Sequence, residues 1–242
     1  MSSIRDLISG KKRPRIPELA PELTPYDVET IELAKPATMT SPQRLQALIL
    51  GIRYVHRRSL TGAIVECGVW RGGSMFAAAR TLLNLHDCTR ELYLYDTFSG
   101  MPAPTEKDKR HTDGASAASI LLDPKEEMTR ANAGLDIVQA TMARSGYPSE
   151  RVHFVQGKVE DTIPGVAPAS IALLRLDTDW YSSTLHELEH LYSRLVPGGV
   201  LIIDDYGWWE GARRAVDEFF SRHEQPPLLN VIDATGRIGI RA

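Results

Sequence analysis

Two pairs of aspartates, Asp177 with Asp179 and Asp204 with Asp205, stand where apolar runs of the sequence end. Ligands of wound α/β sheets bind beyond the carboxyl ends of the strands, so the four carboxylates are expected at one edge of a sheet. Like charges packed together raise one another's cost of ionisation, which a bound cation removes. Because the donors are oxygens and no Cys or His set lies near them, the pattern predicts Mg²⁺ rather than zinc. Any one of these acids alone would more often cap a turn or helix, so the prediction rests on the coincidence of two pairs.

A glycine-rich stretch, 62–74, begins as an apolar run, breaks into glycines and then enters a good helix former. Glycine lets a ligand approach the backbone, and the first free N–H groups of a helix offer donors to a nucleoside-like cofactor. Glu66 would repel a dinucleotide pyrophosphate but suits a ligand that carries an ammonium and a sulfonium. The stretch therefore predicts a site for S-adenosylmethionine, while the alternative is a plain strand-to-helix connection.

Asp96 ends the next apolar run, about thirty residues beyond Glu66, a little farther than the usual position of a ribose ligand in nucleotide-binding folds. Its carboxylate could accept hydrogen bonds from both ribose hydroxyls. Alternatively it caps the turn through Phe98, as Asp often does. The position after a strand favours the cofactor role.

Short apolar runs alternate with segments of helical period, which predicts an α/β fold with a mostly parallel sheet. Strands are expected within 62–74 and at 91–96, 151–157, 171–177 and 200–203, with a closing antiparallel hairpin at 228–232 and 237–241.

The helices between these runs are expected to begin and end at recognisable residues. Ser41 and Pro42 suit the start of the helix that leads into the first strand. The helix after Tyr181 is expected to stop at 197–199 (Pro-Gly-Gly). His186 and His190 on it are spaced like a metal pair, but we interpret them, with Glu187 and Glu189 beside them, as part of a solvated face.

The composition excludes several classes of protein. The net charge of −3 over 242 residues, without a sustained basic stripe, argues against nucleic acid as a partner. The sequence shows neither an apolar run of membrane-spanning length nor a secretory signal, so no membrane association is expected. Only two cysteines are present, which favours a reducing cytoplasm.

Two segments depart from the alternating pattern. Residues 1–40 are basic and rich in proline, which predicts an arm or lid outside the main domain at 41–242. The connection from Gly100 to Asp123 is longer than usual and rich in small and charged residues, as in mobile binding loops. Both segments are expected to order over bound ligands.

Five stretches of the sequence resemble the macrocin O-methyltransferase family of natural-product tailoring enzymes, over roughly residues 39–220. They are Met39–Ser41, Val65–Ser74, Tyr95–Pro102, Leu176–Thr184 and Ile203–Gly207. The resemblance implies a class I S-adenosylmethionine-dependent methyltransferase fold of Rossmann-like type and dependence on Mg²⁺. It further implies O-methylation of a sugar hydroxyl on a glycosylated small molecule, and a homodimer.

The resemblance also assigns roles to individual residues. It places the metal on Asp177, Asp204 and Asp205 and makes Asp179 or Asp177 the general base. The residues that it places along the cofactor site are Thr40, Glu66, Gly68, Ser74, Asp96 and Ser99. The arm and the 100–123 connection, where the similarity is weakest, would select the acceptor.

Two other classes remain open from the sequence. A nicotinamide-dependent oxidoreductase would share the sheet, but its pyrophosphate would not tolerate Glu66. A non-catalytic relative would keep the fold as a binding module, but it would not need the four aspartates. The favoured mechanism is direct methyl transfer to a metal-bound hydroxyl, with an aspartate taking the proton.

Overall fold

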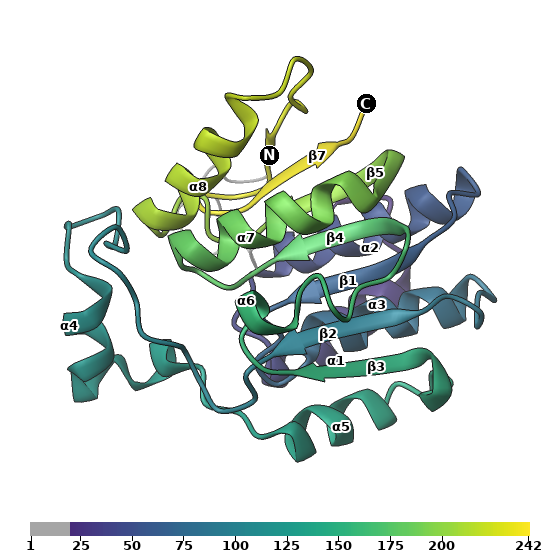
Figure 1. Cartoon of the computed structure of the whole chain (residues 1–242). Helices are drawn as coiled ribbons and strands as arrows, with labels where there is room; N and C mark the ends of the chain where they lie inside the picture. The colour runs from purple at the N-terminus through teal and green to yellow at the C-terminus, as the bar shows by residue number, and fades with distance from the viewer. Residues whose placement is uncertain (1–19) are drawn as a thin grey trace, which may run out of the picture.

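The computed structural model describes residues 20–242, which form a seven-stranded sheet in the order β3-β2-β1-β4-β5-β7-β6 (Figure 1). The first five strands of this order run parallel, and β7 is antiparallel to both β5 and β6. The strands are β1 (Ala63–Cys67), β2 (Leu92–Asp96), β3 (Val152–Gln156), β4 (Ile171–Leu176), β5 (Leu195–Ile203), β6 (Asn230–Val231) and β7 (Arg237–Ile240). The α/β class, the parallel order and the closing antiparallel hairpin are confirmed.

Helices cover both faces of the sheet, which buries β1 and β4 completely. One core cluster joins the sheet to α1 (Pro25–Ala34), α2 (Pro42–Arg57), α3 (Gly73–Asn84) and α5 (Leu135–Ala143). A second joins it to α6 (Val159–Thr162), α7 (Tyr181–Leu191) and α8 (Glu210–Phe220). A third, smaller cluster packs α4 (Ala117–Leu122), which lies beside the sheet, against Trp180, Trp209 and Ala212. In the described part of the chain, no helix is both long and apolar enough to cross a membrane.

The start of α2 follows the prediction, because the Ser41 side chain accepts a hydrogen bond from the Arg44 N–H and Pro42 opens the helix. The end of α7 differs from the predicted end at 197–199. The helix stops at Leu191, and Leu195, which lies before the expected end, opens β5 and pairs with Ile171. A short 3₁₀ turn at 192–194 ends the helix early, and the Pro-Gly-Gly stretch is absorbed inside the strand as a shift of register.

The expected boundary at residue 40 does not separate a loose arm from a packed domain. Helix α1 packs against α2 and α3, and its Ile31 and Ala34 belong to the main core. A capping box on Thr24 begins the helix, and a buried Asp27 pairs with Arg53 of α2. The composition of the predicted arm suggested weak packing because prolines and charged residues dominate it. A few apolar residues at helical spacing are nevertheless enough to bury one face of α1 in the core. Residues 1–19 of the predicted arm lie outside the described residues.

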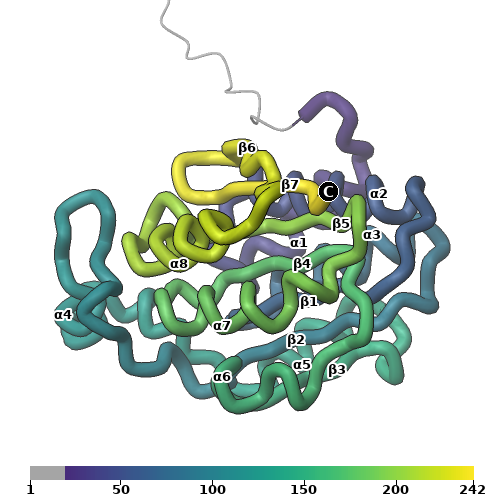
Figure 2. The backbone as a smooth tube through the Cα atoms, turned by 45° about the horizontal axis from the view of Figure 1, so that its top comes forward, coloured from purple at the N-terminus to yellow at the C-terminus, as the bar shows by residue number. Residues whose placement is uncertain are grey.

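The hairpin of β6 and β7 lies beside the start of α2, at the same end of the molecule as the carboxyl end of β5 (Figure 2). Asp233 in its turn accepts hydrogen bonds from the Thr235 and Gly236 N–H groups and pairs with Arg44 at 3.1 Å. Burial raises the pKa of Asp233, but these bonds and the arginine outweigh it and lower the pKa to about 2. The β6–β7 turn and the start of α2 are therefore joined by an ionised carboxylate.

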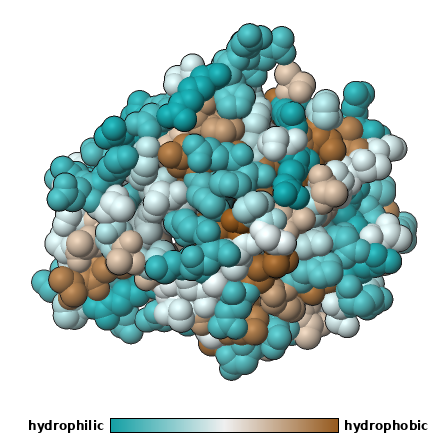
Figure 3. Space-filling model, viewed as in Figure 1, coloured by the Kyte–Doolittle hydropathy of each residue, from teal (hydrophilic) through white to brown (hydrophobic). Residues whose placement is uncertain are grey.

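Much of the connection from Gly100 to Asp123 is fixed rather than loose. Asp108 is fully buried and accepts hydrogen bonds from Thr105 of the same loop and from the backbone N–H of Tyr181, the first residue of α7. The neighbouring Lys109 and Arg110 pair through their backbones with 208–210. The apolar surface over α4 in Figure 3, where Leu122 is 80% exposed, is the outer part of the same connection.

Replacing Asp108 by Ala should release the 104–117 segment, because the carboxylate joins the loop to the N-terminus of α7. Gly211→Ala should do the same, since a Cβ at Gly211 would overlap the Asp108 carboxylate. Hydrogen exchange of the Ala117 amide, bonded to the Asp108 carbonyl, is the measurement, with faster exchange expected in both variants. Glu106→Ala, an exposed change in the same loop, is the control. Unchanged exchange in Asp108→Ala would show that the loop is held elsewhere.

Candidate active site

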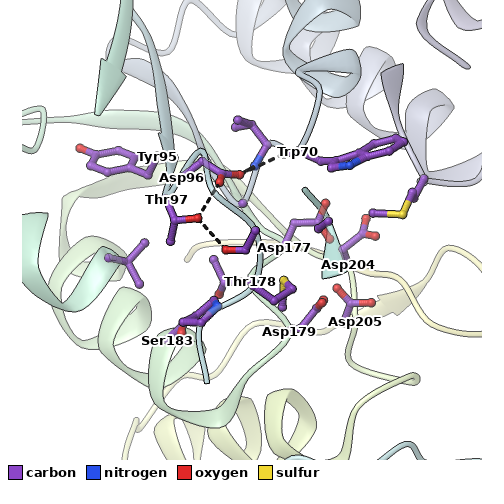
Figure 4. A pocket seen from close by; sticks show the side chains of 18 of the residues that line it. Trp70, Tyr95, Asp96, Thr97, Asp177, Thr178, Asp179, Ser183, Asp204 and Asp205 are labelled. Atoms are coloured by element: carbon purple, nitrogen blue, oxygen red, sulfur yellow. Dashed lines mark hydrogen bonds between the residues drawn. The ribbon is translucent and has the colours of Figure 1, made fainter. Parts of the chain in front are cut away.

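A pocket of about 420 Å³ opens at the carboxyl ends of β1, β2, β4 and β5 (Figure 4). It is reached by segments that follow each of these strands, and by 38–40 from the chain before α2. Of the residues predicted from the sequence, those that line it are Thr40, Gly68, Ser74, Asp96, Asp177, Asp179, Asp204 and Asp205. The convergence of separate sequence positions at one sheet edge is therefore observed.

Two predicted residues, Glu66 and Ser99, are not among the lining residues. Glu66 is 1% exposed and points to Arg175 behind the pocket wall, and Ser99 is exposed on the surface. Glu66 is buried because Arg175, which lies beneath the acids, binds its carboxylate. The assignment of both residues to the cofactor stays a prediction, and the lining does not support it.

The glycine-rich turn after β1 passes very close to the end of β4. Gly68 has φ of +80°, and a Cβ there would overlap the carbonyl oxygen of Asp177. Gly72, with φ of +83°, immediately precedes α3. The turn therefore brings backbone N–H groups and the α3 N-terminus to the pocket, next to the first aspartate pair.

Asp96 fulfils the turn-capping role that the sequence left open, and it does more. Its Oδ1 accepts a hydrogen bond from the Phe98 N–H at 2.8 Å, and its Oδ2 accepts from the Val69 and Trp70 N–H groups at 2.8 and 3.0 Å. Figure 4 shows the carboxylate between the two turns. The Thr97 hydroxyl also lies 3.4 Å from Oδ1, so the two oxygens together accept four hydrogen bonds. Asp96 thus joins the loops after β1 and β2 and lines the pocket beside them.

A buried arginine lies beneath the acids. Arg175 of β4 is 1% exposed and forms ion pairs with Glu66 of β1, with Asp177 at 2.7 Å and with Asp204 after β5. Burial raises the pKa of Glu66 to about 7, against the lowering effect of Arg175. The other Glu66 oxygen, Oε2, has no hydrogen-bond partner among residues 20–242.

Asp204 is fully engaged by cations and a hydroxyl. Besides Arg175 it pairs with Arg44 of α2, and both of its oxygens lie 3.1 Å from the Thr40 hydroxyl. Because both Asp204 oxygens already have partners, Asp204 has no free oxygen to offer beside Asp177 and Asp205, the other two residues of the predicted metal site.

The carboxylates that do come together are Asp177, Asp179 and Asp205, each with an oxygen within 4.8 Å of the others. Burial, with the neighbouring carboxylates, raises the pKa of Asp177 and Asp205 well above the usual range and that of Asp179 to about 7. The Asp205 Oδ2 atom is buried without a partner in the described residues. Three carboxylates this close together, one of which has an unsatisfied oxygen, suit a hard cation such as Mg²⁺.

Sequence reasoning missed Arg175 and Arg44 as part of the site. A signal for Arg175 was present, because a charged residue inside an apolar strand, two positions before Asp177, lies on the same face as that aspartate. Arg44 gave no such signal, since a polar residue in the first turn of an amphipathic helix is ordinary.

The strand order with an antiparallel β7, the glycine turn and the acids at the carboxyl edge together define a class I S-adenosylmethionine-dependent methyltransferase fold. The solved structure of the O-methyltransferase NovP superposes with a TM-score of 0.73 at 28% identity, covering 85% of this chain and 82% of that one.

The chain belongs to the macrocin O-methyltransferase family, whose model matches residues 31–238. One relative, the 8-demethyl-8-(2,3-dimethoxy-alpha-L-rhamnosyl)-tetracenomycin-C 4′-O-methyltransferase of Streptomyces olivaceus, is 35% identical over 204 residues, 82% of this chain and 73% of the relative. The mycinamicin III 3″-O-methyltransferase of Micromonospora griseorubida is 34% identical over 200 residues, 82% and 76%. The protein is therefore an O-methyltransferase, which sets aside the oxidoreductase and the non-catalytic binding protein.

Replacing Arg175 by Met should lower the free energy of unfolding by about 3–5 kcal/mol, because three acids lose their buried counter-charge. Glu66→Gln in the same background should restore part of the loss by removing one uncompensated charge. Urea unfolding at neutral pH is the measurement.

Arg213→Met provides the control, since the Arg213–Asp217 pair on α8 is about half exposed and contributes at most about 1 kcal/mol. An Arg175→Met variant as stable as this control would show that the acids are neutralised by other means.

Proposed function

We propose that the protein transfers the methyl group of S-adenosylmethionine to a sugar hydroxyl of a glycosylated small molecule, with the help of Mg²⁺. The observation that carries the proposal is the shared pocket, in which the glycine turn and the Asp177, Asp179 and Asp205 cluster face the same space. The name of the Streptomyces olivaceus relative specifies O-methylation of a rhamnosyl compound, and that of the Micromonospora griseorubida relative specifies O-methylation of mycinamicin III, which supports an acceptor of this kind. The identity of the acceptor and the predicted homodimer stay open to direct measurement.

The cofactor would bind along the turns after β1 and β2. Gly68 lines the pocket where the turn passes close to Asp177, Ser74 lies buried at the start of α3, and Asp96 would accept hydrogen bonds from the ribose. Because Asp96 already has backbone partners, it is held in place before any ligand arrives. Such preorganisation lowers the ordering cost of binding.

S-adenosylhomocysteine should raise the melting temperature of the protein, and NAD should not, because only the former avoids placing a pyrophosphate near these acids. Asp96→Ala should weaken its binding about tenfold to a hundredfold, measured by calorimetry. Glu106→Ala, at an exposed residue outside the pocket, should leave the affinity unchanged. Equal stabilisation by NAD would contradict the cofactor assignment.

The acids fit a magnesium ion by donor type and by the unsatisfied Asp205 oxygen. We propose Asp177, Asp204 and Asp205 as its ligands and Asp179 as the base, as the family resemblance implies. Since Arg175 and Arg44 already bind the Asp204 carboxylate, Asp204 would have to share its oxygens between them and the ion. When bound, the ion would lower the pKa of the acceptor hydroxyl. Asp179 would take the proton, a role suited to a carboxylate whose burial raises its pKa to about 7. Arg175 and Arg44 would keep the Asp204 carboxylate in place beside them.

Asp177→Asn and Asp205→Asn should each weaken Mg²⁺ binding at least about tenfold in calorimetry, and excess EDTA should abolish methylation by the wild type. Asp179→Asn should retain the affinity and lose about a hundredfold or more in turnover. Asp217→Asn, a half-exposed acid on α8, is the control.

Comparison of Asp204→Asn with Asp179→Asn decides the third ligand. Loss of affinity only in Asp204→Asn supports the assignment, whereas loss only in Asp179→Asn would place the ion in the observed cluster and remove Asp179 as the base. Full methylation in EDTA would overturn the metal requirement.

A further inference from the structure

The turn that carries Asp179 adopts an unfavourable backbone conformation. Asp179 has φ of +68°, in the left-handed region that residues other than glycine seldom occupy. Such a conformation is unfavourable and persists only where surrounding contacts determine it. Within the turn, the Trp180 N–H donates to the Thr178 carbonyl at 2.8 Å. The contacts that hold Thr178 therefore also hold Asp179.

The side chain of Thr178 is held by a residue on α7. Its hydroxyl donates to the Oε1 atom of Glu187 at 2.9 Å. Glu187 is fully buried, although the sequence placed it on a solvated face, and its Oε2 atom has no hydrogen-bond partner within the described chain. The i,i+4 pair of histidines beside it is only half-buried and binds backbone carbonyls, so the face of α7 turned to the sheet is the one with the acid.

A buried acid at this position is costly for stability. A carboxyl group removed from water with one of its oxygens unpaired is less favourable for stability than an apolar side chain of similar size. Burial raises the pKa of Glu187 well above its usual range. Glutamine has the same shape and keeps an oxygen for the Thr178 hydroxyl, so it is the close substitute at this position.

Thr178 itself faces the reaction space. It lines the pocket together with Ser183, whose hydroxyl donates to Glu160, and both are visible in Figure 4 next to the aspartates. A small displacement of Thr178 would therefore move Asp179 relative to Asp205. Misplacement of a reacting group by about 1 Å is enough to lower a rate about a hundredfold.

We propose that Glu187 is a positioning residue which, through the Thr178 hydroxyl, holds Asp179 in its left-handed conformation and aims its carboxylate at the acceptor. This role rests on the proposed function, in which Asp179 is the base. Glu187 does not touch the reacting atoms. It acts from the far side of the turn, by fixing the residue before Asp179.

Three variants test the connection. Thr178→Val removes the donor and keeps the shape, Glu187→Leu removes the acceptor, and Glu187→Gln keeps an oxygen for Thr178. We expect the first two to lower kcat about tenfold or more while the KM for S-adenosylmethionine changes less than about twofold, and Glu187→Gln to stay near the wild type. The Thr178→Val and Glu187→Leu double variant should be no slower than either single one, since both break one interaction. Glu189→Gln, a partly exposed acid on the same helix, is the control.

A second readout does not depend on the acceptor. Amide hydrogen exchange of Trp180, bonded to the Thr178 carbonyl, should be faster in Thr178→Val and Glu187→Leu and unchanged in Glu187→Gln. If methylation fails in the wild type but exchange follows this pattern, the turn is positioned as proposed and only the function assigned to it falls. Wild-type kcat and exchange in Thr178→Val, or a Glu187→Gln variant as slow as Glu187→Leu, would overturn the positioning role.

Discussion

The site depends on a single buried guanidinium. Arg175 joins the ends of β1, β4 and β5 by binding one carboxylate after or within each strand, namely Glu66, Asp177 and Asp204. A planar group with several fixed donors can hold such a set, whereas a lysine could satisfy fewer of them. Because removal from water makes an unpaired charge very unfavourable, cation and acids must be buried together or not at all. The positions of the acids at the pocket floor follow from this requirement.

A second constraint is steric and acts on the backbone above the guanidinium. The turn at Gly68 passes so near to Asp177 that only glycine fits, and the sheet ladder continues beyond the strands through the Asp177 and Asp204 N–H groups, which bond to the carbonyls of Cys67 and Leu176. The two aspartate pairs are thus held by main-chain contacts before their side chains make any. Rigid placement of this kind is what an active site requires of its scaffold.

The sequence was sufficient for the strands, their alternation with helices and the meeting of the acids, because these follow from periodicity and from the geometry of parallel sheets. It was insufficient where a polar residue turned inward. Glu187 and Asp108 are buried because a hydrogen-bond donor from another element reaches each of them. A local sequence pattern does not indicate a partner from another element. The pairing of Asp204 with Arg44, 160 positions away, was not predicted from the sequence for the same reason. Helix α1 was not predicted as part of the packed domain, because its composition is unfavourable for packing and only a few apolar residues bury it in the core.

Charge balance connects the geometry to the proposed chemistry. At the pocket floor two arginines, Arg175 and Arg44, face more carboxylates than they can neutralise. Burial, and after it the neighbouring carboxylates of Asp177 and Asp204, raise the pKa of Asp179 to about 7. On the proposed mechanism Asp179 gains a proton from the acceptor hydroxyl as the bond from sulfur to the methyl carbon breaks and the bond from that carbon to oxygen forms. One negative charge on the protein and one positive charge on the sulfonium disappear together, so the net charge of the site is the same before and after. A buried site solvates a change of net charge poorly, and a reaction that makes none avoids that cost. The crowding of acids thus serves both halves of the step, because it attracts the cationic donor and makes a carboxylate basic enough to accept the proton.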